Sequence, residues 1–432
     1  MERFKPGKIL HTNTGRQITV MEFIDDGTQG DVYRVSFEGQ EKALKWYHPK
    51  AIRDPVAFYA NLEDNVNKGS PDRVFLWPIA ITRKEEGSFG YLMDLIPTGY
   101  KKMSTILTTR GGGGFATFKA IADASIKMVS AFRSLYKSGY SYQDLSPANI
   151  FINPETGDVL IGDVDNVAPN GVHTGIIGTP QYMAPEIVTG KARPNIHTDE
   201  FSLSVVIFML LCASHPLEGE HWAVPCLTPE IEEALYGSHA LFIFDPNDAS
   251  NRPVRGVHNN VLKRWGFMPD YLKNAFQKAF SQEAIRNPNK RFTYVAWLKV
   301  LTRFQSDIVR CPHCRNEIFI KDAASTKCDR CGRMYKVSHT LKLYDYSITA
   351  ARNTRVYKCQ MGVCNADEAL LPVALVIEKP GSPDVLGLRN MTHEIMTGTT
   401  PSGRVNKVHP GEIVPVRNGI RLAVYDSEIL IQ

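Results

Sequence analysis

Residues 140–168 read YSYQDLSPANIFINPETGDVLIGDVDNVA, and the fold is best predicted from this stretch. Its two apolar runs, IFI and VLI, are typical of short β-strands joined by a turn. Asp144 and Asn149 precede the first run, and Asp163 follows the second. Read alone, these three could be ordinary polar residues of turns and of a β-hairpin. The sequence on either side decides between a structural and a chemical interpretation.

A glycine-containing loop and a lysine lie upstream, in strand-like sequence. The loop, DDGTQGDV at 25–32, separates two apolar runs; backbone N–H groups near Gly27 and Gly30 can close over phosphates, while Val32 can cover a base. A tight hairpin turn is the alternative for this loop. Lys45 lies on the next strand but one, where its amine can reach phosphates, although a solvated strand lysine is the alternative there.

The remaining pattern predicts a β-rich lobe followed by a helical one. The β-rich lobe runs from Ile18 to about Leu95 and contains one helix at 54–68, which opens with Asp-Pro. A long segment, 214–267, shows no secondary structure of its own; since it is too long for a plain connection, it is expected to pack on the helical lobe. Further helices are expected at 115–138, 185–188, 199–213, 269–281 and 292–304.

The order and spacing of these motifs resemble the catalytic core of protein kinases, over about residues 18–304. Where the family has H-R-D-L-x-x-x-N, this chain has YQDL at 142–145 and then Asn149; where it has D-F-G, the chain has DVD at 163–165. The resemblance implies that Asp144 accepts the proton of the substrate hydroxyl and that Asn149 and Asp163 hold Mg²⁺. With Lys45, these three form the expected catalytic set.

Two later segments extend the resemblance. GTPQYMAPE at 178–186 is similar to the end of the activation segment of Ser/Thr kinases, which implies that Thr179 lies near the catalytic base and that Ser or Thr is the acceptor. The resemblance also implies that Asp199 ties the catalytic loop to the lobe core. It implies a buried, structural salt bridge between Arg291 and Glu186.

The same resemblance implies an ATP site between the lobes, with Met93 as gatekeeper, Asp94 to Ile96 as hinge and Phe151 beneath the base. The expected nucleotide-binding residues are Gly27, Gly30, Val32, Ala43, Lys45, Glu63, Met93, Asp94, Ile96 and Phe151. Glu63 is the only glutamate near the helix position that pairs with the strand lysine in the family. If Asn61 is the inward residue, that pair does not exist.

Four departures from the family pattern affect this expectation. Asp25 replaces the first loop glycine and brings an acid near the phosphates. Gln143 replaces the arginine that receives an activation-segment phosphate. Ser146 replaces a catalytic-loop lysine, a loss comparable to the ~3–4 kcal/mol seen when one preorganised donor is removed. Val164 and Asp165 replace Phe and Gly, and Asp165 lacks the backbone freedom of glycine.

The cysteines after residue 310 predict a metal site. Cys311, Cys314, Cys328 and Cys331 form two CxxC pairs of zinc-ribbon spacing, which suits tetrahedral Zn²⁺; a pair of redox dithiols is the alternative. Cys359 and Cys364 could be a second half-site, a disulfide or buried thiols, and buried thiols are favoured.

Strand-like runs at 371–431 predict a seven-stranded sandwich. The last turns loosely resemble forkhead-associated domains. Because no Gly-Arg or Ser-x-x-His phosphothreonine pocket is evident, this resemblance implies a possible fold and not the recognition.

The length of the chain agrees with several domains. A chain of 432 residues is too long for one core, and a net charge of +5 permits an acidic ligand without indicating nucleic acid. With no signal-peptide run and no span-length apolar stretch, a cytoplasmic, non-membrane protein is expected. The expected architecture is α+β: kinase lobes at 1–97 and 98–305, a zinc ribbon at 306–337 and a β-rich domain at 338–432.

The expected function is ATP-dependent Ser/Thr phosphorylation with Mg²⁺ or Mn²⁺, including autophosphorylation. The arrangement, with FIFDPNDASNRP at 242–253, resembles bacterial kinases encoded beside a metal-dependent phosphatase and a von Willebrand A-domain protein, which implies those two partners. The first alternative is a nucleotide-binding pseudokinase scaffold that acts through its tail. A nucleic-acid reader is a weaker alternative, because the ribbon lacks an aromatic and basic stripe.

Overall fold

The structure, a computed structural model, describes residues 3–85, 87–108, 114–172, 178–224, 226–362 and 364–432. The chain forms two compact units. The first comprises residues 1–114, 130–265 and 277–291, and the second comprises 115–129, 266–276 and 292–432. The domain boundaries expected from the sequence motifs do not coincide with the limits of these two units, and they stay predictions.

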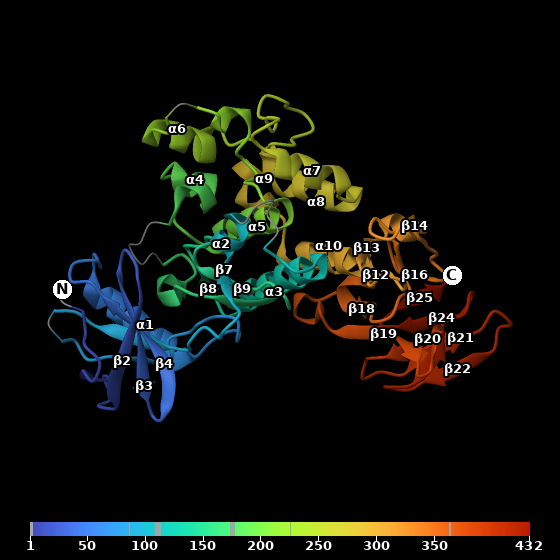
Figure 1. The fold of residues 1–432 in the computed structure, drawn as a ribbon, viewed down its shortest axis with the longest axis horizontal. Coiled ribbons are helices and arrows are strands. Elements are labelled where there is room, and N and C mark those ends of the chain that lie inside the picture. Colours follow the sequence, from blue (N-terminus) through green and yellow to red (C-terminus); the bar gives the residue numbers. More distant parts are fainter. Residues whose placement is uncertain (1–2, 86, 109–113, 173–177, 225, 363) are drawn as a thin grey trace. The chain divides into compact units, whose positions relative to one another are not determined.

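The first unit begins with a six-stranded antiparallel sheet in the order β1-β2-β3-β4-β6-β5, drawn in blue in Figure 1. Along β3 every second residue is buried, which is the period-two pattern of a strand with one face on a core. This agrees with the strand-like runs in the sequence. The strands are β1 (Ile9–His11), β2 (Gln17–Asp26), β3 (Gly30–Phe37), β4 (Gln40–Tyr47), β5 (Ala80–Ile81) and β6 (Gly90–Met93).

The helix predicted at 54–68 is α1 (Pro55–Lys68). The Asp54 carboxylate accepts hydrogen bonds from the backbone N–H groups of Val56 and Ala57, and proline occupies the first turn. An N-cap carboxylate satisfies N–H groups that have no partner within the helix, so the helix begins here.

Helices make up most of the rest of the first unit, in green to yellow in Figure 1. The most buried is α5, whose second half is continuously apolar and which starts with a capping box between Asn195 and Thr198. The helices after α1 that lie wholly in this unit are α2 (Met103–Thr108), α4 (Pro185–Val188), α5 (Ile196–Cys212), α6 (Pro229–Glu233) and α9 (Gln282–Arg286). Three more, α3 (Phe118–Lys137), α7 (Asn259–Phe267) and α8 (Asp270–Ala279), are divided between the two units, and α10 (Tyr294–Ser306) belongs to the second.

Short strands hold the loops that carry the motifs. The hairpin predicted from residues 140–168 is present as β9 (Ile150–Asn153) and β10 (Asp158–Ile161), with Phe151 opposite Leu160. β9 also pairs with β7 (Lys101–Lys102), and β8 (Tyr140–Ser141) pairs with β11 (Ala168–Pro169).

The expectation that 214–267 lacks secondary structure is wrong. The segment contains α6, α7 and a π-helical turn, Ala234–Ser238. α6 is a five-residue helix held by its Thr228 cap, and so short a helix leaves little periodicity in the sequence. The segment does pack on the helical lobe: Phe242 is fully buried and stacks on Phe280 with ring centroids 5.2 Å apart.

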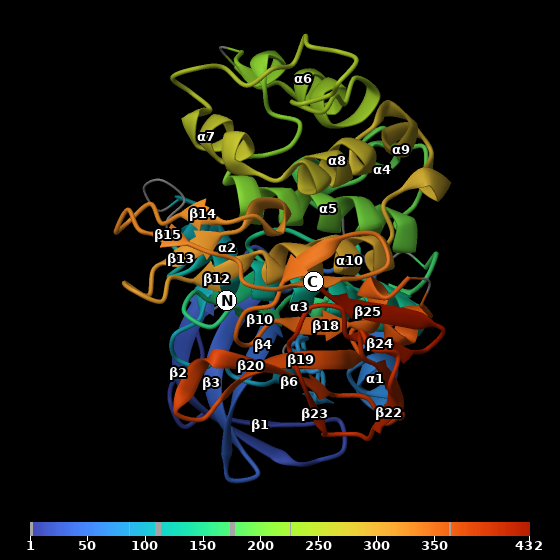
Figure 2. The same cartoon turned by 90° about the vertical axis from the view of Figure 1, so that its right-hand side faces the viewer.

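The second unit contains two small hairpins followed by two larger sheets (Figure 2). The hairpins pair β12 (Ile308–Arg310) with β13 (Glu317–Phe319), and β14 (Thr326–Lys327) with β15 (Met334–Tyr335). The sheets are ordered β17-β16-β25-β24-β21-β22 and β18-β19-β20-β23. Their strands are β16 (Thr340–Lys342), β17 (Ser347–Thr349), β18 (Arg355–Tyr357), β19 (Pro372–Lys379), β20 (Ser382–Asn390), β21 (Met396–Thr399), β22 (Val405–Val408), β23 (Ile413–Pro415), β24 (Arg421–Val424) and β25 (Ser427–Ile431).

One apolar core is shared by both larger sheets, as in a sandwich. It includes Val376 and Leu388 from one sheet, and Leu422 and Ile429 from the other. Seven strands lie between Pro372 and Ile431, as the sequence predicts for that stretch, and three more from 340–357 join them. In the described part of the chain, none of the helices combines the length and the apolar character needed to cross a membrane.

Candidate active site

Asp199, on α5, anchors the loop that carries Asp144. Its carboxylate accepts the backbone N–H groups of Tyr142 at 2.6 Å and Gln143 at 3.1 Å, as the resemblance implies. Burial raises the pKa of Asp199 to about 7, although the two N–H bonds act to lower it. The loop that carries Asp144 is therefore attached to the most buried helix of the lobe.

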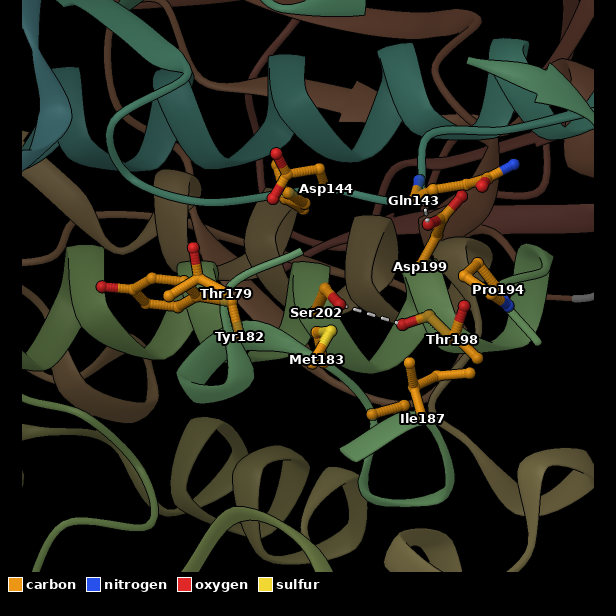
Figure 3. Close-up of a pocket in the computed structure, with 12 residues that line it drawn as sticks. Gln143, Asp144, Thr179, Tyr182, Met183, Ile187, Pro194, Thr198, Asp199 and Ser202 are labelled. Atoms are coloured by element: carbon orange, nitrogen blue, oxygen red, sulfur yellow. Dashed lines mark hydrogen bonds between the residues drawn. The ribbon is translucent and has the colours of Figure 1, made fainter. Parts of the chain in front are cut away.

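Asp144 lies at the end of this loop, facing the segment that contains Thr179 (Figure 3). Burial, together with the negative charges of Asp163 and Asp165, raises its pKa to about 6, although a hydrogen bond from the Thr179 backbone and the charge of Lys45 act to lower it. The pocket between Asp144 and α5 has a volume of only ≈ 10 Å³, about one water molecule. A carboxylate of this basicity can accept a proton near neutral pH.

Asn149 and Asp163 lie at neighbouring ends of the β9–β10 hairpin. The N–H of Gly162 donates to the carbonyl of Asn149 at 2.8 Å, which joins the two ends. The Asn149 side-chain amide donates to the Asp144 carbonyl at 2.9 Å. Asp163 has the left-handed backbone conformation φ 45°, ψ 43°, and its side chain is 47% exposed. An amide oxygen and a carboxylate at one edge are ligands of the kind that Mg²⁺ prefers.

Lys45 reaches these carboxylates from β4. Its ammonium group lies 3.0 Å from Asp163 and 2.7 Å from Asp165. Burial alone would lower the pKa of Lys45, but the charges of Asp165 and Asp163 outweigh it and raise the pKa above its ordinary value. The structure thus brings all four residues of the expected catalytic set to one region of the first unit.

The residues expected around an adenine base also converge. Ala43 and Met93 belong to one buried apolar cluster, and Val32 and Phe151 pack against it. Strand pairing explains this, because Val32 lies opposite Lys45 and Ala43 lies opposite Met93. This cluster is an apolar surface on the lysine side of the site.

The other residues expected to bind the nucleotide lie outside that apolar cluster. The N–H of Gly27 donates to the carbonyl of Gly30 at 2.9 Å, and this bond closes the loop between β2 and β3. A Cβ at Gly30 would lie 2.3 Å from the Trp46 carbonyl oxygen, so close packing against β4 requires glycine there. In the hinge, Asp94 pairs with Lys42 at 2.6 Å, and Ile96 is exposed.

The expected partnership of Glu63 with Lys45 is not formed. Glu63 is exposed on α1 and accepts a hydrogen bond from Asn13 at 3.1 Å. Two amides of α1, those of the half-buried Asn61 and the buried Asn65, both donate to the Val167 carbonyl, at 2.8 and 3.0 Å.

Two other departures from the family pattern have structural compensation. Gln143 donates from its amide to the Val172 carbonyl at 2.7 Å, so it contacts the activation segment directly. Asp25 pairs with Lys102 at 3.1 Å. Thr174, a candidate position for phosphorylation in the activation segment, lies outside the described residues.

The expected salt bridge below the activation segment is confirmed. The Arg291 guanidinium lies 2.6 Å from the Glu186 carboxylate and also donates to the His197 carbonyl at 2.7 Å. The side chains of Arg291 and Glu186 are 2% and 16% exposed. The pair therefore fixes the end of the segment to α5 without touching the catalytic residues.

The four cysteines of the two CxxC pairs converge in the second unit. Their sulfur atoms all lie within 4.8 Å of one another, with Cys311 and Cys331 3.8 Å apart and Cys314 and Cys328 3.6 Å apart. Zn–S bonds of about 2.3 Å in a tetrahedron separate the sulfurs by about 3.8 Å, so the donor set fits Zn²⁺. Cys359 is a buried thiol, in agreement with the favoured interpretation, and Cys364 is half-buried; neither forms a disulfide in the structure.

Comparisons with known proteins find that part of the chain is similar to protein kinases. Residues 83–294 match the protein kinase domain family. A probable serine/threonine-protein kinase, MARK-C of Dictyostelium discoideum, is 26% identical over 156 residues, 35% of this chain and 19% of that protein. CBL-interacting protein kinase 29 of Oryza sativa subsp. japonica is 32% identical over 92 residues, 21% of this chain and 20% of that protein. The matches thus cover about a fifth of each relative.

Proposed function

We propose that this chain is a Ser/Thr protein kinase that transfers the γ-phosphate of ATP to a protein hydroxyl, including its own. One observation carries the proposal: Lys45, Asp144, Asn149 and Asp163 are all present and converge beside an apolar surface suited to adenine. Phosphoryl transfer depends mainly on positioning and charge, and these groups supply both.

Each residue has a distinct task in this proposal. Lys45 binds the phosphates of the nucleotide, and Asp144 accepts the proton of the acceptor hydroxyl. Asn149 and Asp163 would hold Mg²⁺ or Mn²⁺, which when bound neutralises charge on the phosphates. Asp163 already pairs with Lys45, so the ammonium lies beside one of the residues that would hold the metal.

The pseudokinase alternative is not favoured, because all four of these groups are present. Ser146 is the one catalytic-loop position with no cationic side chain where the family has lysine. The proposal therefore includes slower transfer than in kinases with that lysine.

The tail enters the proposal as a structural module. The four converging thiols support a zinc ribbon, and the shared core of the two sheets supports a sandwich of forkhead-associated type. A bacterial, cytoplasmic signalling role is part of the proposal. A metal-dependent phosphatase and a von Willebrand A-domain protein are its proposed partners.

Incubation of the purified chain with γ-labelled ATP, Mg²⁺ or Mn²⁺ and a generic protein substrate tests the proposed activity. Label on Ser or Thr of the substrate or of the chain itself is expected, and it should be lost in Asp144→Asn. If the wild-type chain binds nucleotide but never transfers label, the scaffold alternative holds instead.

A further inference from the structure

Asp165 is the most buried charged residue near the active site, and the roles proposed so far do not use it. Its side chain is 0% exposed, and its carboxylate lies 2.7 Å from the Lys45 ammonium. The Tyr47 hydroxyl donates to the same carboxylate oxygen at 2.6 Å. A buried carboxylate held by two donors has a fixed position, which an exposed ion pair does not have.

No carboxylate of α1 contributes to this pair. Glu63 is turned to Asn13, and the α1 side chains that bind the segment after Asp165 are two amides, which donate to the Val167 carbonyl. In protein kinases the strand lysine must pair with a helix glutamate to be aligned for phosphoryl transfer. In this chain the helix cannot supply that partner.

The position of Asp165 allows it to pair with Lys45 in place of a helix glutamate. Asp165 lies in the 3-10 helix Val164–Asn166, and this helix begins directly after Asp163, which is a candidate metal ligand. Both carboxylates contact Lys45, so one ammonium bridges two acids of a single short segment. A bound cation would compete with Lys45 for Asp163 but not for the buried Asp165, which keeps the lysine in place.

We propose that Asp165 is a positioning residue that replaces the helix glutamate and holds Lys45 toward the phosphates of the nucleotide. This inference rests on the proposed kinase function. It has a regulatory consequence: the partner of Lys45 belongs to the metal-binding segment itself, so alignment of the lysine does not depend on movement of α1.

The test compares Asp165→Asn, which keeps shape and loses charge, with Glu63→Gln as the matched control on α1. A misplaced catalytic group costs on the order of 10²-fold, so kcat/KM for ATP should fall about that far in Asp165→Asn and stay unchanged in Glu63→Gln. Equal losses in both variants, or no loss in Asp165→Asn, would overturn the proposal.

A double-mutant cycle on ATP affinity separates positioning from general stability. Asp165→Asn should weaken ATP binding in the wild-type background and have almost no effect in a Lys45→Met background, because its effect passes through the lysine. Equal effects in both backgrounds would contradict the proposal. Since binding is measured, the cycle stays informative even if the wild-type chain transfers no phosphate.

Should Asp165→Asn fail to fold, Tyr47→Phe provides the second variant. It removes only the hydroxyl that holds Asp165, and a smaller loss of kcat/KM that disappears in the Lys45→Met cycle supports the proposal. An unchanged kcat/KM in folded Tyr47→Phe, with Asp165→Asn unfolded, would count against it.

Discussion

At the scale of single residues, the carboxyl group of Asp144 has the most direct consequence for catalysis. Burial and the neighbouring Asp163 and Asp165 raise its pKa to about 6, and the ionised form is the one that can accept a proton. Activity is therefore expected above this pKa and should be lost as the pH falls through it. The measurement is kcat against pH, with an acid limb near pH 6; a flat wild-type profile between pH 5 and pH 8 would argue against Asp144 as the base.

Gln143 leads to a prediction about activation. Its amide holds the Val172 carbonyl, a contact that needs no phosphate, and no arginine stands at this position. Phosphatase-treated protein should therefore start turnover without a lag. A lag that disappears after pre-incubation with ATP, and in Thr174→Ala, would show that another basic group reads a phosphate in this segment.

Four residues of the site could be predicted from the sequence, but the buried partner of Lys45 could not. Lys45, Asp144, Asn149 and Asp163 follow from motif spacing, because each lies at a fixed offset from a strand end. The exchange of Glu63 for Asp165 does not follow from spacing. It depends on which residues of α1 face inward, and a helix turns by about 100° for each residue. The only sign of this partner in the sequence is the second acid of the DVD motif, Asp165, where the family has glycine.

At the scale of elements, the pair between Arg291 and Glu186 joins the activation segment to α5. Both partners are largely buried, so Arg291→Ala should leave the Glu186 carboxylate unpaired and lower the free energy of unfolding by about 3–5 kcal/mol. Urea unfolding measures this. The control is Lys290→Ala, which removes an exposed pair with Glu283 and should change stability little; equal effects would mean that the buried pair has no special role.

Elements with clear periodicity or caps could be predicted from the sequence. α1 has a capping carboxylate and a first-turn proline, and the β9–β10 hairpin has continuous apolar strands. α6 could not be predicted, because a five-residue helix is decided by its cap and its packing. The three early strands of the sandwich were missed for another reason: each has only three residues, and β16 pairs with β25, whose sequence lies about 90 residues away.

At the scale of the whole molecule, zinc should support the second unit and not the catalytic site. A ribbon of this size has few apolar residues, so most of its folding free energy should come from metal binding. Cys311→Ser with Cys314→Ser, or chelation, should unfold residues 310–336 and leave ATP affinity nearly unchanged. Atomic absorption should give one zinc per chain. Protein without zinc after purification under reducing conditions would contradict this, as would a large loss of ATP affinity on chelation.

Phosphoryl transfer by the four converging residues is the central claim, and one paired measurement tests it most directly. Metal-dependent ATP binding and the rate of γ-phosphate transfer are measured for Asp144→Asn and Asp163→Asn. Asp144→Asn should bind ATP almost as the wild type does and transfer phosphate far more slowly, because only the acceptor hydroxyl loses its base. Asp163→Asn should lose both metal-dependent binding and transfer. A double variant that still autophosphorylates at the wild-type rate would contradict the account.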